Sequence, residues 1–224
     1  MKQGKSIFIV TVLFFVSVSG ILAQNANQGI IRELSGTVEI RQPGSADWVI
    51  ARQGQIIGKD SIISTSFKSS ALISMGHTLI TVRPLTRLTL GELAISAETE
   101  IINVNLGAGR VRVEVKAPSG TQAVMKVQSP IATASVRGTV FELDPYNLEV
   151  YEGTVEFSGS HGSDLLVDEG RMSYVDDITG RAVSPETAAA VELRPELPFG
   201  TDALPQNNDV APNDSTILSI TISW

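Results

Sequence analysis

The sequence predicts an all-β fold: an antiparallel or mixed β-sandwich or β-roll of stacked short hairpins, with a short helix and a flexible tail at the C-terminus. Between Gly29 and Val175, short β-branched or alternating runs follow one another, separated by turn-forming stretches such as "QPGSADW" and "DPYN". No helix-length pattern lies between the runs, which argues against alternating strand–helix units. The expected strands lie at 37–42, 55–58, 61–65, 71–75, 78–82, 86–90, 100–106, 110–115, 123–128, 133–136, 138–143, 148–153, 154–159, 164–167 and 171–175.

Several of these runs alternate with period two. In "RVRVEV" (110–115) the three valines share one face and the two arginines and the glutamate share the other. This pattern is typical of a half-buried strand with one solvated face. The arginines are interpreted as part of that solvated face, with Glu114 close by, rather than as an anion-binding stripe.

A short phrase recurs at strand starts: glycine, any residue, then valine, in "SGTVEI" (35–40), "AGRVRV" (108–113), "RGTVFE" (137–142) and "EGTVEF" (152–157). The intervals are uneven, which favours stacked hairpins over a strict repeat. Glycine at a strand start permits positive φ or a bulge that turns the chain between sheets. We therefore expect Gly138 to mark a bend or bulge between two paired strands. Arg137 should lie beside it, with its side chain either on the rim or paired with a nearby carboxylate.

The first 23 residues are typical of an export signal. Lys2 and Lys5 precede an uncharged apolar run of about a dozen residues, shorter than the roughly 20 that span a bilayer, and Ala23 supplies a small residue for cleavage. The alternative is an uncleaved N-terminal anchor, and only in that case do we expect a membrane partner. We expect a periplasmic or secreted protein of the bacterial cell envelope.

Composition limits the classes of function. The chain has 224 residues and no cysteine, which excludes a thiol nucleophile, a thiolate metal site and a disulfide. With the two signal lysines removed, 15 basic residues stand against 24 acidic ones, a net charge of −9. Repulsion from phosphate makes nucleic acid an unexpected partner.

The C-terminal part changes character after residue 180. "SPETAAAVEL" (184–193) predicts a short helix, with Ser184 as N-cap and Pro185 in the first helical position. Residues 181–215 as a whole are expected to comprise this helix and a Pro/Asn/Asp-rich linker, after a β domain at 24–180. The last nine residues, 216–224, alternate as a one-sided strand that could add to a sheet edge of this domain or of a partner; its apolar face consists of Leu218, Ile220, Ile222 and Trp224.

The phrase "VQSPIATASVRGTVFEL" (127–143) resembles the signature of FecR-type domains, a core of the form tP-x-a-x-a-x-VRGT-x-F followed by an eGxV element. "GKDSIIST" (58–65) and the segment 71–90 are similar to upstream parts of the same pattern, although His77 stands where the family has serine. The matching motif positions are Pro130, Arg137, Gly138, Thr139, Phe141, Glu152 and Gly153.

The resemblance implies an extracytoplasmic β domain. The best-known members relay a signal from an outer-membrane receptor to a cytoplasmic sigma factor. Only five residues precede the apolar run here, so that sigma-regulator role is not expected. We expect the motif residues to be mainly architectural, with Arg137 pairing with a carboxylate such as Glu152.

No catalytic set stands out. His77 and His161 both fall in predicted turns, and "SHGSD" (160–164) merely gathers triad residue types in one loop. "DVAPND" and "VDD" lack the spacing of a calcium loop. The sequence therefore predicts no enzyme and no cofactor, but a binding or sensing module for an unidentified envelope protein or glycan. The alternatives are a structural component of an envelope assembly or, if the N-terminal segment is not cleaved, a membrane-anchored signalling regulator. The oligomeric state is left open.

Overall fold

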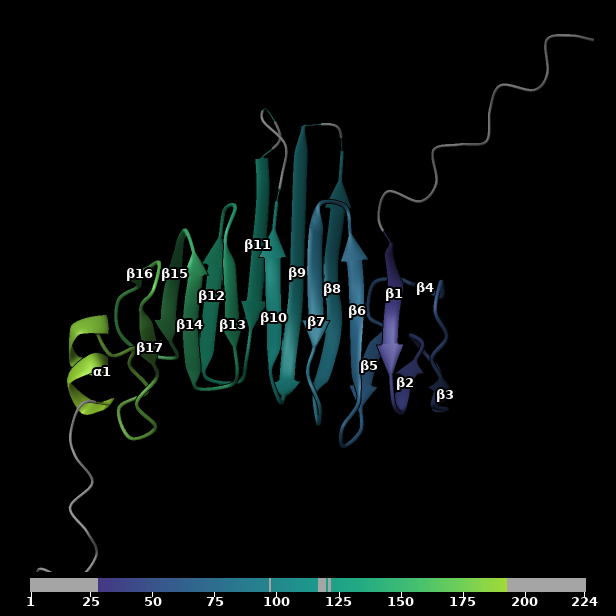
Figure 1. The fold of residues 1–224 in the computed structure, drawn as a ribbon, viewed down its shortest axis with the longest axis horizontal. Helices are drawn as coiled ribbons and strands as arrows, with labels where there is room; N and C mark the ends of the chain where they lie inside the picture. Colours follow the sequence, from purple (N-terminus) through teal and green to yellow (C-terminus); the bar gives the residue numbers. More distant parts are fainter. Residues whose placement is uncertain (1–27, 97, 117–119, 121, 193–224) are drawn as a thin grey trace, which may run out of the picture. The chain divides into compact units, whose positions relative to one another are not determined.

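The computed structural model describes residues 28–96, 98–116, 120 and 122–192, which form two facing β-sheets and one short helix (Figure 1). The eight-stranded sheet runs in the order β17 (Met172–Tyr174), β14 (Asn147–Glu152), β13 (Val140–Leu143), β10 (Val111–Val115), β7 (Thr78–Val82), β6 (Ser70–Met75), β1 (Gly29–Ser35) and β4 (Ile56–Ile57). The nine-stranded sheet runs in the order β16 (Leu165–Asp168), β15 (Thr154–Gly159), β12 (Ala132–Val136), β11 (Gln122–Gln128), β9 (Thr99–Ala108), β8 (Arg87–Ile95), β5 (Ile62–Thr65), β2 (Val38–Arg41) and β3 (Val49–Ile50).

The chain advances along the two sheets by switching between them every one or two strands. The β6–β7 hairpin lies in one sheet, β8–β9 in the other, β10 back in the first, and the alternation continues to β17. Figure 1 shows this order as a gradual change of colour along the sheets. Among the paired strands of the described residues, only β9–β11 is parallel, so the expected antiparallel or mixed sandwich of short hairpins is confirmed.

Apolar side chains from both inner faces form one core between the sheets. In β10 the three valines are at most 2% exposed, while Arg112 and Glu114 lie on the outer face, as the alternation predicts. Phe141 and Phe157 are the largest fully buried side chains. Two strands were not among the runs expected from the sequence: β1, and the two-residue edge strand β3.

The glycines of the recurring phrase lie where the chain changes sheet. Gly36, Gly109, Gly138 and Gly153 have φ of 71°, 82°, 67° and 81°, the left-handed region that suits glycine. The expected bend at Gly138 is present, but the expectation that it joins two paired strands is wrong. β12 and β13 lie in different sheets, because the bend carries the chain across the core.

The predicted helix is α1 (Pro185–Glu192), and the Ser184 hydroxyl accepts a hydrogen bond from the Thr187 N–H at 3.3 Å, as an N-cap does. Ala188 is buried, and α1 packs against β17. The expected signal at 1–23, most of the linker, and the strand at 216–224 lie outside the described residues. Within the described part of the chain, no helix is long and apolar enough to cross a membrane.

Candidate functional site

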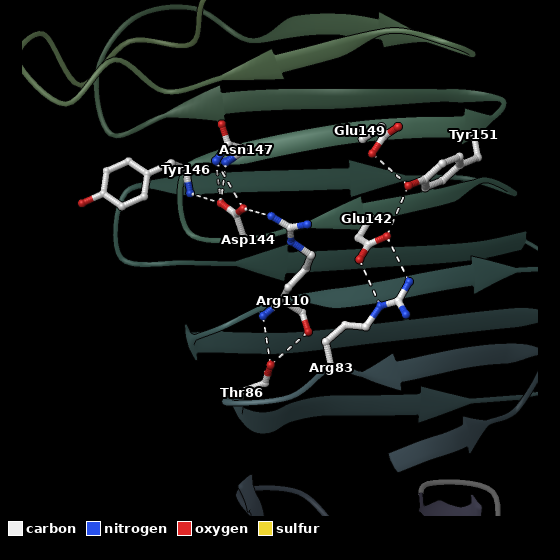
Figure 2. Close-up of polar contacts among 9 residues, drawn as sticks. All are labelled: Arg83, Thr86, Arg110, Glu142, Asp144, Tyr146, Asn147, Glu149 and Tyr151. Carbon is white, nitrogen blue, oxygen red and sulfur yellow. Dashed lines mark hydrogen bonds and ion pairs between the residues drawn. The ribbon is translucent and has the colours of Figure 1, made fainter. Parts of the chain in front are cut away.

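Polar side chains concentrate on the outer face of the eight-stranded sheet, where β10, β13 and β14 lie side by side (Figure 2). The strand register places Arg112 opposite Glu142, and Glu142 opposite Glu149. These residues alternate with core residues along their strands, so the period-two pattern that builds the core also builds this face.

Two arginines engage two of the carboxylates. Arg83 binds Glu142 through both Nε and Nη2, at 3.0 and 3.3 Å, and Arg110 Nη2 lies 2.9 Å from Asp144 Oδ2. Glu142 is only 9% exposed, and its bidentate ion pair with Arg83 compensates the cost of burying its charge. Arg110 is thus paired with Asp144, and Arg112 Nε lies 3.7 Å from Glu114 Oε1, in agreement with the solvated-face interpretation of these two arginines.

Tyr151 connects the remaining groups. Its hydroxyl lies 2.8 Å from Glu149 Oε2 and 3.2 Å from Glu142 Oε2, and the Arg112 guanidinium stacks on its ring at 4.4 Å. Burial, the hydrogen bond to Glu149 and the negative charge of both carboxylates raise the pKa of Tyr151 to about 12. The phenol therefore stays protonated, and its single O–H donates to Glu149, the nearer of the two carboxylates.

Asp144 organises the turn between β13 and β14. It accepts hydrogen bonds from the backbone N–H groups of Tyr146 and Asn147, at 2.9 and 2.8 Å. Partial burial opposes its ionisation, but these bonds and the contact with Arg110 outweigh burial and lower the pKa of Asp144. The hydrogen bond and charge of Asp144 in turn raise the pKa of Arg110 against the effect of burial.

A shallow cavity of about 210 Å³ opens on this face between β14 and β17. Its charged lining includes Arg110, Asp144 and Glu149, and Met172 and Tyr174 of β17 supply half-buried apolar walls. A second cavity of about 200 Å³ lies beside His161, Tyr146 and Ile178. The first combines convergent polar groups with apolar walls, which is the composition expected of a binding site.

A buried glutamate ties the two sheets together elsewhere. Glu100 of β9 has a 1% exposed side chain and accepts hydrogen bonds from the backbone N–H of His77 at 2.9 Å and from the Thr78 hydroxyl at 2.8 Å. His77 Nδ1 lies 3.0 Å from the same carboxylate. A side-chain Cβ at Gly76 would overlap the Glu100 carboxylate, so this β6–β7 turn is shaped to hold it.

The signature residues lie in the core and in two crossovers, which are the turns at Gly138 and Gly153 where the chain changes sheet. Pro130 lies exposed in the β11–β12 turn, and Phe141 is fully buried in β13. Thr139 is 2% exposed, its carbonyl accepts the Val115 N–H at 2.9 Å, and a Cβ at Gly153 would lie 2.8 Å from its Cγ2. The two crossovers therefore pack directly on each other.

The expected ion pair of Arg137 with Glu152 is absent. Both residues are exposed, and no ion pair joins Arg137 to a carboxylate anywhere in the described residues. Arg137 lies in the turn itself while Glu152 ends β14, and close packing of Thr139 on Gly153 holds the two segments together instead. Leu218, Ile220, Ile222 and Trp224 lie outside the described residues.

Both histidines lie in turns, as predicted, but their rings have different hydrogen-bond partners. Ser160 Oγ lies 3.1 Å from His161 Nδ1, but no hydrogen bond or ion pair joins Asp164 to that ring in the described part of the chain. His77 is oriented by Glu100, yet no hydroxyl group among the described residues bonds its other ring nitrogen. Within the described ranges, no three His, Asp or Glu side chains are placed to hold a metal.

The sequence did not single out Arg83, Glu142, Asp144, Glu149 and Tyr151. Their signal is weak but present: in "VFEL" and "LEVYE" the polar residues alternate with core residues, as in 110–115. Alternation identifies an outer face, but it does not say which strands lie next to each other.

Two facing, mostly antiparallel sheets with a polar cluster on one outer face define an all-β domain suited to binding. The family model described as FecR protein matches residues 61–156, and the resemblance drawn from the sequence is confirmed over these residues. The match supports a regulatory or signalling role on the extracytoplasmic side of the membrane. It matches a regulatory class rather than a catalytic one.

Two crystal structures, each provisionally described as an anti-sigma factor from Parabacteroides distasonis, are similar to this chain. They have 15% and 16% sequence identity and TM-scores of 0.44 and 0.45, and each comparison covers 58% of this chain. The chain spans 64% and 62% of the length of those two structures. None of the curated proteins matches the chain.

Proposed function

We propose that this protein is a non-catalytic regulatory module of the periplasm or cell exterior that binds another envelope protein through the outer face of its eight-stranded sheet. The observation that carries the proposal is the cluster around Tyr151 with its adjoining cavity. The signal-like N-terminus and the FecR match support the extracytoplasmic location.

A protein partner fits this face better than a glycan. Interfaces between proteins are enriched in tyrosine, methionine and arginine. Arg110, Met172 and Tyr174 line the cavity, and Tyr151 contacts the lining residue Glu149 while Arg112 stacks on its ring. Charges of both signs stand in fixed ion pairs, which supplies directional contacts for a charged partner.

Site-specific photo-crosslinking in cells tests the proposal. A benzoylphenylalanine at Thr81, which lies opposite Arg112 on the same face, is expected to cross-link one discrete protein. The matched control is the same probe at Ser135, opposite Lys126 on the outer face of the nine-stranded sheet, and no adduct is expected there.

Four results would contradict the proposal. Identical adducts from both positions, or none from either, would remove the role of this face. An adduct sensitive to glycosidase but not to protease would indicate a glycan ligand. Adducts formed solely with other copies of the chain would favour a structural component.

N-terminal sequencing of the recovered protein tests the cleavage after Ala23, and retention of Met1 would instead favour a membrane-anchored regulator.

A further inference from the structure

We infer that the cavity beside Glu149 binds a cationic side chain, arginine or lysine, of a partner polypeptide. This inference rests on the proposed function, because it names the chemistry that the outer face recognises.

The charges around the cavity leave one carboxylate without a cation. Glu142 is held by Arg83, and Asp144 by Arg110. Glu149 is exposed and makes no ion pair with any described residue; its contact is the Tyr151 hydroxyl at 2.8 Å. Glu149 is therefore the one carboxylate of the cavity lining without an ion-pair partner among the described residues, and a guanidinium or ammonium group would pair with it.

The walls fit the stem of a long side chain. The register places Met172 directly opposite Glu149 and Tyr174 opposite Asn147, so a thioether and an aromatic ring stand next to the carboxylate. Arginine and lysine bury aliphatic stems against such surfaces while their heads remain charged, and a guanidinium can also stack on a tyrosine ring. The cavity of about 210 Å³ is smaller than typical sites for drug-sized ligands, which suits a single side chain.

Other ligand classes fit less well. An anion would meet three carboxylates and one arginine that is already paired. A metal ion would gain nothing from Met172 and Tyr174, and the described residues offer no three-ligand set. The local field agrees, because Glu142 and Glu149 help to raise the pKa of both Arg110 and Tyr151 and so favour their protonated forms.

Methionine-methyl NMR gives a direct test. The full chain has four methionines; Met75 and Met125 are at most 1% exposed in the core, whereas Met172 lines the cavity. In the ¹³C-methyl-labelled chain, N-acetyl-arginine amide is expected to shift the Met172 signal saturably and to leave the two core signals in place. A Met172→Leu variant assigns the peak.

The charge dependence follows from two comparisons. N-acetyl-citrulline amide, a neutral analogue of nearly the same shape, should bind about tenfold more weakly, and Glu149→Gln should weaken the arginine probe about tenfold. Glu114→Gln is the matched control: this outer-face glutamate already contacts Arg112 and Lys116, lies outside the cavity lining, and should leave the titration unchanged.

The inference is overturned if Met172 does not respond, if both amides act equally, or if magnesium chloride reproduces the shift. If Glu149→Gln displaces the core methionine signals, the two amides compared on the natural chain still decide the question. Loss of the arginine response together with face-specific cross-linking would reject the cationic ligand while leaving the proposed function in place.

Discussion

The packing of Gly153 on Thr139 makes a quantitative prediction about the FecR signature. Gly153→Ala introduces a Cβ at φ 81°, which costs about 1–2 kcal/mol for the left-handed conformation. The same Cβ would lie 2.8 Å from Thr139 Cγ2, inside ordinary contact distance, and overpacking of this kind costs about 1–3 kcal/mol more. We expect a total loss of about 2–5 kcal/mol in the free energy of unfolding.

Gly138→Ala provides the matched control. Gly138 has a similar φ of 67°, but a Cβ there meets no atom within 4 Å, so only the conformational cost of about 1–2 kcal/mol applies. Any effect of alanine on the unfolded chain is common to both variants and cancels in the comparison. The difference between the two variants therefore reports the contact between the crossovers.

Urea unfolding followed by far-UV circular dichroism measures both losses, provided that the m-values agree. In a Thr139→Ser background, which lacks the Cγ2 methyl, the difference between Gly153→Ala and Gly138→Ala should fall below about 1 kcal/mol. Equal losses for the two alanine variants, or an unchanged difference in the serine background, would refute the packing explanation.

Three further predictions concern other parts of the molecule. Glu100→Ala should lower the free energy of unfolding in urea by about 3 kcal/mol, because it leaves the donors at His77 and Thr78 without their acceptor. The control Glu98→Ala, at an exposed neighbouring position, should cost little, and equal effects of the two variants would contradict the role of Glu100 in joining the sheets. Leu85→Gly should raise the free energy of unfolding by about 0.5 kcal/mol, because Leu85 is 62% exposed and glycine relieves the strain of its left-handed φ of 57° at some entropic cost. A loss above 1 kcal/mol would show that the leucine side chain contributes to packing. The folded pKa of about 12 for Tyr151 lies above the ordinary value of 10, so its contribution to stability is complete below pH 10 and is lost as the pH rises through 12. Absorbance titration at 295 nm should show one of the three tyrosines titrating near pH 12, and Tyr151→Phe should remove that component.

The parts of the fold that depend on local sequence could be predicted. Alternation in 110–115 gave the correct buried face, and the glycine–x–valine phrase marked four turns with positive φ, although the sequence placed the turn at Gly138 between paired strands rather than between sheets. Both signals depend on properties of neighbouring residues: the two-residue period of a strand and the backbone freedom of glycine.

The site could not be predicted, because it depends on register. Arg83 and Glu142 are 59 positions apart and meet because β7 and β13 both pair with β10. Glu100 and His77 are 23 positions apart; Glu100 belongs to β9, and His77 lies in the β6–β7 turn of the other sheet. Positive φ at Lys68 and Leu85 has no local signal either, since turns that change sheet impose it on residues that do not favour it.

The family signature and the candidate site occupy alternate positions of the same strands. Phe141 and Val150 face the core, whereas Glu142 and Tyr151, each one residue further along, belong to the outer face. The signature therefore specifies the crossovers and the core, and it leaves the outer face free to differ without loss of the fold. If this division holds, substitutions at outward positions such as Glu149 alter recognition with little change in stability, and substitutions at Thr139, Phe141 or Gly153 do the reverse. A strongly destabilising Glu149→Gln variant would contradict it, because the exposed carboxylate would then be part of the scaffold.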